Sequence, residues 1–511
     1  MPRFSIVIPT RNRAYTLQHT LRTCIEQREF EDYEIVVSDN FSTDDTAEMV
    51  MKFASDKIKY YKTDAPLTMT DSFNFAVSKA KGDYVVFIGS DDAVHTYGLY
   101  LLDKVLSTTG EKVVRWVPGH YFWPDYMYSH ERCHFHIRES TTFSITRAKE
   151  NVKRIVNYTQ GYEHLPICYL YTAVHKSILQ EIENRAGSVF DSIPPDYYSG
   201  FAISAVVDHF ITIGIPVCIM GISGMSIGST GILGKPEKHQ VGMFMHAGVS
   251  TYCDSIVMDN FFCAKRNLGA FDGIEVDYRK HIQSVVNECY SINMYRGEQG
   301  RSVFARNIET IKHVINNSLE LMSYCDTKEL NTDNYIFLEP EQVLHTSQLG
   351  SMTCIDTSMF GAENILDVAL LTERLFHNKK NIDIFLSKLQ QSWDRILELS
   401  ASLSGYKRLG VYATGSHTAK FLDMYESFCD ADCELVLFDS SSDKWGTLFH
   451  GHKVLPPSAI PEQCLDALVI SSFVYQNEIY ESIKQYSCST KIIKLYGKNS
   501  VNLPAQTFFS Y

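Results

Sequence analysis

Two adjacent carboxylates follow an apolar stretch near residue 90. The stretch Tyr84-Val-Val-Phe-Ile is typical of a buried strand, and it leads through Gly89 and Ser90 to Asp91 and Asp92. Carboxylate oxygens are the ligands that hard divalent cations such as Mg²⁺ or Mn²⁺ prefer. The pair therefore predicts a metal site. The alternative is that both acids cap the helix that follows.

Two earlier apolar stretches also end in polar residues. Residues 4–8 lead into Pro9, Thr10 and Arg11, and residues 33–38 lead into Asp39. In sheets of parallel strands, ligands bind beyond the carboxyl ends of the strands. We therefore expect these residues to lie beside Asp91 at one edge of a sheet. For Asp39 the alternative is a turn with the residue that follows.

The first 115 residues alternate short apolar stretches with helical patterns. This alternation predicts an α/β fold with a mostly parallel sheet. The expected strands are 4–8, 33–38, 58–61 and 84–88, and the expected helices are 14–27, 44–53 and 70–79. Residues 116–235 then form an accessory half that is rich in aromatic residues, with a helix at 196–210 and a strand at 216–222.

The remainder of the chain divides into two parts. Residues 240–403 are mainly helical in pattern, and residues 406–500 return to strands and helices that predict a small doubly wound domain. Its first turn keeps only Gly415 of a dinucleotide-binding pattern, with Asp439 following 24 residues later, which is a weak signal. The segment resembles the nucleotide-binding-like domain appended to some sugar-modifying enzymes, which implies that it binds a nucleotide, holds an acceptor or mediates assembly. Either part is a candidate surface for a homo-oligomer.

Composition limits the classes of function. A chain of 511 residues predicts two to four domains, and a net charge of −13 argues against nonspecific binding to nucleic acid. Thirteen scattered cysteines without CxxC pairs indicate a reducing, cytoplasmic compartment and no structural zinc site. The N-terminus lacks the pattern of a secretory signal. No stretch has the composition of a transmembrane helix, while peripheral membrane contact stays open.

Several motifs together resemble family 2 glycosyltransferases with the A-type fold. They are Phe4-Ser-Ile-Val-Ile-Pro-Thr-Arg-Asn-Arg-Ala, Asp39-Asn-Phe-Ser-Thr-Asp-Asp-Thr, Ala80-Lys-Gly-Asp-Tyr and Gly89-Ser-Asp-Asp. The resemblance covers about residues 1–235. It implies a Rossmann-like mixed sheet and metal-dependent, inverting transfer of a sugar. The donor would be a nucleotide sugar, with UDP expected, and the acceptor a hydroxyl of a glycan or another molecule, in surface polysaccharide biosynthesis.

The resemblance also implies roles for the residues at the strand ends. Asp92 would bind Mn²⁺ or Mg²⁺ directly, and Asp91 would contact the metal or the ribose. The family often has an aspartate at the position of Gly89, so this chain carries a variant of the motif. Asp39 would accept the ring N–H of uracil. The first loop, with Pro9, Thr10 and Arg11, would line the nucleotide pocket, whereas a surface position is an equal alternative for Arg13.

The accessory half would supply the rest of the site. In relatives the general base is an acidic residue that opens a helix in the second half of the domain, and Asp196, which follows two prolines, would take this role. The alternative is that Asp196 is only an N-cap and that another acid serves. Those other acids are Asp191, Glu163 and Asp208. Asp71 and Asn74 lie where relatives contact ribose or donor sugar, or else Thr70 or Asp71 only caps that helix. His239 is the candidate third metal ligand, because a histidine after the accessory strand sometimes completes the metal shell in relatives.

Three other functions are weighed against this one. Nucleotidyl transfer would need a glycine-rich first loop, which residues 9–13 do not have. A catalytically inactive, transferase-like scaffold would not need Asp39, Asp91, Asp92 and Asp196 together. A bifunctional enzyme with a second activity in residues 406–500 stays open.

Overall fold

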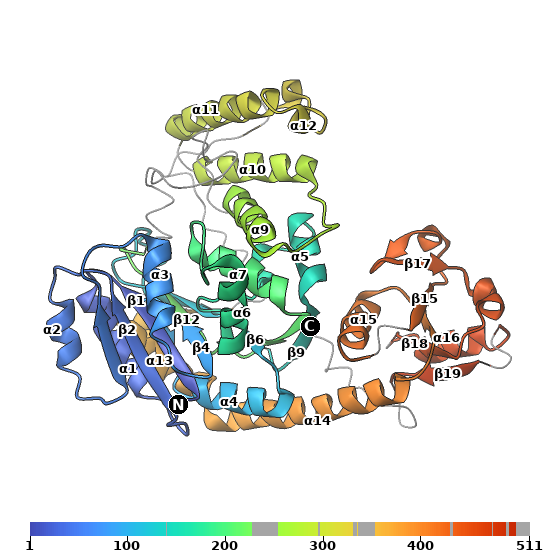
Figure 1. Cartoon of the computed structure of the whole chain (residues 1–511), viewed down its shortest axis with the longest axis horizontal. Helices are drawn as coiled ribbons and strands as arrows, with labels where there is room; N and C mark the ends of the chain where they lie inside the picture. The colour runs from blue at the N-terminus through green and yellow to red at the C-terminus, as the bar shows by residue number, and fades with distance from the viewer. Residues whose placement is uncertain are drawn as a thin grey trace.

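The computed structural model describes residues 1–138, 140–226, 254–294, 297–330, 335, 353–429, 433–472, 474–486 and 490–496. His239 and most of the segment after Ser226 lie outside these residues. The described elements form a mixed α/β protein built on three sheets, with a long helix running beneath the N-terminal part toward the C-terminal one (Figure 1). The α/β fold class predicted from the sequence is confirmed.

The largest sheet contains eight strands, of which β1, β2, β3 and β4 run parallel to one another. Its order is β3-β2-β1-β4-β10-β6-β11-β9, in which β10 runs antiparallel to both of its neighbours. The strands are β1 (Phe4–Thr10), β2 (Tyr33–Asp39), β3 (Ile58–Lys62), β4 (Tyr84–Phe87), β6 (Val113–Arg115), β9 (Phe143–Arg147), β10 (Thr172–His175) and β11 (His209–Ile213). The helices around it are α1 (Ala14–Ile25), α2 (Thr46–Met51), α3 (Met69–Ser78), α4 (Gly98–Thr109), α5 (Ala148–Val156), α6 (Lys176–Ala186) and α7 (Pro195–Val206).

A second sheet lies beside the first and carries the strand that follows the acidic pair. Its order is β13-β8-β7-β12-β5, with β5 (Ala93–Val94), β7 (Gly119–Phe122), β8 (His134–Ile137), β12 (Cys218–Ile222) and β13 (Thr353–Asp356). Because β5 pairs with β12, the turn at Asp91 is brought against the residues that leave β12.

One expected helix is shorter than predicted. The helix expected over 196–210 ends at Val206, and His209–Ile213 forms β11 instead. Val207 is already in an extended conformation, and β11 pairs with β9 and β6. The apolar and β-branched residues after Asp208 suit a buried strand, so sheet pairing overrides the continuous apolar pattern.

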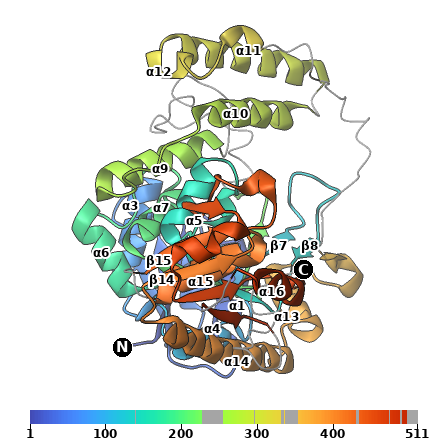
Figure 2. The ribbon, with the colours of Figure 1, turned by 90° about the vertical axis from the view of Figure 1, so that its right-hand side faces the viewer.

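The helices between 254 and 403 pack in different places. Helix α9 (Asp254–Leu268) packs on α7, whereas α13 (Ile365–Leu375) packs on α1 and α14 (Lys379–Leu403) packs on α4. The helices α10 (Tyr278–Asn293), α11 (Gly297–Asn316) and α12 (Leu319–Met322) share a core of their own and stand at one end of the molecule in both views (Figures 1 and 2). The division of the chain into domains stays a prediction.

The C-terminal sheet is doubly wound, as its strand pattern predicts. Its order is β16-β17-β15-β14-β18-β19, with β14 (Arg408–Tyr412), β15 (Glu434–Phe438), β16 (Leu448–Phe449), β17 (His452–Leu455), β18 (Ala467–Ile470) and β19 (Lys491–Lys494). The helices are α15 (Ser416–Phe428) and α16 (Gln476–Ile483). Within the described parts of the whole chain, no helix has both the length and the apolar composition needed to cross a membrane.

Candidate functional site

The carboxyl ends of β1, β2 and β4 meet at one edge of the large sheet. Thr10 pairs in register with Asp39, and β4 lies on the other side of β1. The chain leaves β4 through Ile88 and reaches the acidic pair within four residues. The expected gathering of polar residues at this edge is therefore present.

Asp92 is buried and bound on both carboxylate oxygens by backbone N–H groups. The N–H of Gly89 donates to Oδ2 at 2.5 Å, and the N–H of Gly221 donates to Oδ1 at 2.7 Å. Burial raises the pKa of Asp92 well above its usual range, the charge of Asp91 raises it further, and the two N–H groups act in the opposite sense. Through these hydrogen bonds, Asp92 connects the acidic turn to β12.

Asp91 connects two loops that lie far apart in the sequence. Its Oδ2 accepts hydrogen bonds from the hydroxyls of Ser223 at 2.7 Å and Ser226 at 2.6 Å. The same oxygen lies 3.3 Å from Nη1 of Arg13, whose other nitrogen donates to the backbone oxygen of Met225. Arg13 is therefore not a surface residue but the cationic partner of the acidic pair.

Gly89 is required by a side chain that the sequence did not single out. A Cβ at position 89 would collide with the hydroxyl of Tyr169 and would lie 2.7 Å from Oδ2 of Asp92. Tyr169 is held by stacking on Phe73 of α3, with the ring centroids 5.9 Å apart. The phenol thus occupies the space that a side chain at position 89 would need. The glycine at 89 was the one signal in the sequence for such a neighbour.

Asp196 lies in the first turn of α7 and is partly buried. Burial raises the pKa of its carboxyl to about 6, and the backbone N–H groups of Asp196 and Tyr197 limit that rise. Burial also raises the pKa of the Tyr169 hydroxyl, and the charges of Asp92, Asp91 and Asp196 raise it further. Tyr169 therefore interacts electrostatically with both the acidic pair and Asp196.

The other acids considered for the base are placed differently. Asp191 accepts hydrogen bonds from the Asn267 amide and the Ser192 N–H, each at 2.6 Å. Glu163 is exposed in a short 3₁₀ turn, and Asp208 is exposed just before β11. Of the four acids, Asp196 is the one whose charge raises the pKa of the Tyr169 hydroxyl.

Asp39 is fully buried, and its carboxylate already has protein partners. Oδ1 accepts from the N–H of Ser42 at 2.7 Å, which is the turn named as its alternative, and Oδ2 accepts from the hydroxyl of Tyr60. Asn40 is engaged as well, because its amide exchanges two hydrogen bonds with the backbone of Leu67. A carboxylate has about four lone-pair sites, so Asp39 retains capacity for a further donor.

The first loop is fastened to the loop after β2. The N–H of Asn12 donates to the Ser42 hydroxyl at 2.8 Å, and the amide oxygen of Asn12 accepts from the Thr43 N–H at 2.7 Å. Pro9 is partly buried and Arg11 is exposed. Thr10 is buried, and among the described residues its hydroxyl has no hydrogen-bond partner, which leaves a polar atom at the sheet edge unsatisfied.

The residues expected to act from the helix before β4 make hydrogen bonds within the protein. The N-cap of α3 is Thr68, not Thr70 or Asp71, and its hydroxyl pairs with the N–H and carboxylate of Asp71. Thr70 lies inside the first turn of α3, and its hydroxyl donates to the backbone oxygen of Ser192 at 2.7 Å. Asn74 exchanges hydrogen bonds of 2.8 and 3.0 Å with the backbone of Phe190. Their predicted contacts with ribose or donor sugar stay predictions.

Two further expectations concern a third metal ligand and a nucleotide site in the C-terminal domain. His239, the expected third metal ligand, lies outside the described residues, and the described chain holds no cluster of three or more His, Cys, Asp or Glu side chains suited to a metal. In the C-terminal domain the Asp439 carboxylate accepts from the N–H and hydroxyl of Thr414 and pairs with Lys444. Nucleotide binding there stays a prediction.

Comparison with known proteins identifies the N-terminal part. Residues 5–181 match the model of the family described as Glycosyl transferase family 2. A GalNAc(5)-diNAcBac-PP-undecaprenol beta-1,3-glucosyltransferase of Campylobacter jejuni is 33% identical over 115 residues, which are 22% of this chain and 35% of the relative. Abequosyltransferase RfbV of Salmonella typhimurium is 36% identical over 111 residues, which are 21% of this chain and 33% of the relative. The chain thus spans about a third of the length of these curated relatives.

A similar solved structure is that of S. aureus TarS 1-349 in complex with UDP-GlcNAc. It has a TM-score of 0.38 and 15% sequence identity, and the match covers 66% of this chain and 89% of that one. The predicted family resemblance is confirmed by the family model over residues 5–181. The description of the C-terminal domain stays a prediction.

Proposed function

We propose, for a chain whose residues 5–181 form a glycosyl transferase family 2 domain, that it is an inverting glycosyltransferase. The donor is a nucleotide sugar, with UDP as the nucleotide, and the acceptor is a hydroxyl of a glycan or a similar molecule in polysaccharide biosynthesis. The observation that carries the proposal is that Arg13 pairs with Asp91 at the carboxyl edge of the sheet, where the charges of Asp91 and Asp196 both raise the pKa of the Tyr169 hydroxyl.

The donor site is proposed to lie over the ends of β1 and β2. Asp39 accepts the ring N–H of the base with the lone pairs that Ser42 and Tyr60 leave, and the unsatisfied Thr10 hydroxyl gains a partner from the nucleotide. Pro9 and Arg11 flank the nucleotide in the same loop. Arg13 stands closer to the diphosphate, since it already lies beside Asp91.

The oxygen atoms around Asp91 fit a hard divalent cation. A carboxylate and the hydroxyls of Ser223 and Ser226 form an all-oxygen set, which suits Mg²⁺ or Mn²⁺. When bound, the cation would offset the negative charge that grows on the diphosphate. Asp91 is proposed as the ligand in this chain. Asp92, expected from the sequence to be the ligand, holds the turn in place through its two N–H partners.

Asp196 is proposed as the general base. A carboxylate with a pKa of about 6 is ionised at neutral pH and is more basic than an exposed one, which suits removal of a proton from a hydroxyl. The acceptor oxygen then attacks the anomeric carbon from the face opposite the diphosphate. The new glycosidic bond forms as the bond to the diphosphate breaks, and the nucleoside diphosphate leaves with the electron pair.

A screen of nucleotide sugars for hydrolysis in the presence of Mn²⁺ tests this function. The expected result is slow release of UDP from at least one UDP-sugar, because water replaces the missing acceptor. Asp196→Asn should bind UDP as the unsubstituted protein does and lose transfer. No binding and no hydrolysis with UDP-, GDP- or dTDP-sugars would refute the proposed function.

A further inference from the structure

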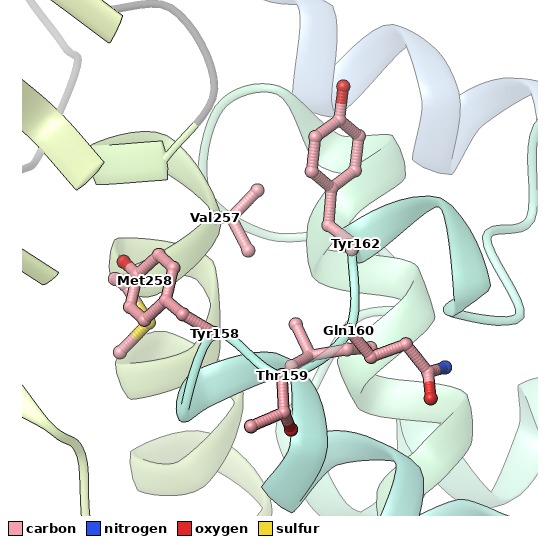
Figure 3. A pocket seen from close by; sticks show the side chains of 8 residues that line it. Tyr158, Thr159, Gln160, Tyr162, Val257 and Met258 are labelled. Carbon is pink, nitrogen blue, oxygen red and sulfur yellow. The ribbon is translucent and has the colours of Figure 1, made fainter. Parts of the chain in front are cut away.

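A cavity of about 350 Å³ lies between the loop that follows α5 and the helix α9 (Figure 3). One wall is the loop around Tyr158 and Tyr162, and the other is formed by Val257 and Met258 of α9. The lining residues are Ile155, Tyr158, Thr159, Gln160, Gly161, Tyr162, Val257 and Met258. Its volume falls in the range of pockets that hold small ligands.

Tyr162 of the cavity lining contacts the first turn of α7, which carries the proposed base. The ring of Tyr162 meets the ring of Tyr197 edge to face, with the centroids 5.1 Å apart. Tyr197 is the residue next to Asp196 in the first turn of α7. A molecule that occupies this cavity therefore lies beside a ring that contacts the residue following Asp196 in the chain.

The lining favours an uncharged ligand with both apolar and hydroxyl groups. Among the described residues that line the cavity, none is charged, so nothing there would neutralise a phosphate or a carboxylate. Tyr158, Tyr162 and the side chains of α9 offer aromatic and apolar surface. The Thr159 hydroxyl donates to the backbone oxygen of Arg154 and the Gln160 amide donates to Asn151, so each keeps an oxygen that can accept a hydrogen bond from a ligand. Sugar rings present such a combination, with C–H groups on one face and hydroxyls around the edge.

The walls are held by contacts outside the cavity, so the shape is set before any ligand binds. The Gln160 amide donates to Asn151 at 2.6 Å, and Asn151 donates to the backbone oxygen of His164 at 3.1 Å. The Tyr158 hydroxyl pairs with the ring of His281 on α10. On the other side, Phe261 of α9 packs against Phe201 of α7, with ring centroids 5.6 Å apart.

We propose that this cavity is an acceptor subsite that binds one sugar ring of a glycan acceptor, next to the residue that receives the new sugar. The proposal rests on the proposed function, because it takes Asp196 as the base that faces the acceptor. It adds a substrate class: the acceptor is a saccharide with at least two units, or a sugar linked to another group. A single small alcohol would leave the cavity unused.

Saturation-transfer NMR with methyl glycosides tests the subsite. The probes are the methyl β-glycosides of glucose, galactose and N-acetylglucosamine, each at millimolar concentration with the full chain. At least one glycoside should receive saturation from the unsubstituted protein. Val257→Trp, which fills the cavity, should reduce that signal at least fivefold, and Gln160→Ala should weaken it. Lys149→Trp, an exposed position on α5, is the matched control and should keep the signal.

Gln160→Ala keeps the test informative if Val257→Trp does not fold, which thermal unfolding will reveal. No signal from any of the three glycosides, or signals that survive both substitutions, would overturn the subsite. Failure of the proposed function has a different signature, since it appears as an absence of nucleotide-sugar hydrolysis by the unsubstituted protein. Saturation of the glycosides does not depend on that reaction.

Discussion

The hydroxyl of Tyr169 occupies the space in which a side chain at position 89 would have to lie. Gly89 therefore leaves room for the phenol of Tyr169 beside the acidic pair. The phenol stacks on Phe73 and interacts with the charges of Asp91, Asp92 and Asp196. An enzyme with an aspartate at 89 and a smaller residue at 169 would build the same edge from different groups.

Gly89→Asp tests this exchange. The substitution should destabilise the protein by about 1–3 kcal/mol, because the new side chain has no room beside Tyr169, and it should weaken binding of UDP with Mn²⁺. Gly89→Asp combined with Tyr169→Ala should recover both properties in part. Urea unfolding and calorimetry measure them. Full stability and full binding in Gly89→Asp alone would show that Tyr169 does not constrain position 89.

Substitution of the two aspartates by asparagine should separate binding from stability. Asp92→Asn should lower the free energy of unfolding by about 1–3 kcal/mol, because a buried amide group would face the N–H of Gly89 or Gly221. Asp91→Asn should change stability less, since its partners are flexible hydroxyls and Arg13. It should abolish Mn²⁺-dependent binding of UDP. The reverse pattern would make Asp92 the metal ligand, as the sequence motif alone suggested.

The rate of transfer should depend on pH through Asp196. A general base must be deprotonated, so the rate should be low below pH 6 and rise to a plateau above it, with a midpoint set by the pKa of about 6. Because this pKa is raised in the folded protein, ionisation of Asp196 also opposes folding, and the stability it contributes at low pH is lost as the pH rises through 6. Asp196→Asn should lose the transfer activity over the whole range. An unchanged pH profile in that variant would assign the base to another group.

The elements of the N-terminal sheet could be predicted because each strand is a short apolar run followed by polar residues. The local pattern of residues was sufficient to predict these strands. As expected, Asp39 and Asp91 follow strands that end at the same edge of the sheet. The local pattern was not sufficient at 209–210, where the residues pair with β9 as part of strand β11 instead of extending α7. Four aromatic residues of the accessory half are buried in the core and are not available to stack on a sugar. These are Trp116, Tyr121, Trp123 and Tyr198.

The partners of the acidic pair could not be predicted in the same way. Arg13 lies 78 residues from Asp91 in the sequence, and Ser223 lies 132 residues from it. Such contacts depend on how β5 pairs with β12, which no local pattern specifies. Tyr169 was missed for the same reason, since a single tyrosine in an aromatic-rich segment carries no signal of its own.

Calorimetric titration of UDP in the presence of Mn²⁺, with the unsubstituted protein and Asp91→Asn, tests the central claim most directly. The account predicts binding by the unsubstituted protein that disappears when Mn²⁺ is replaced by a chelator, and no binding by Asp91→Asn although it remains folded. Equal binding by both proteins, with or without the metal, would contradict it.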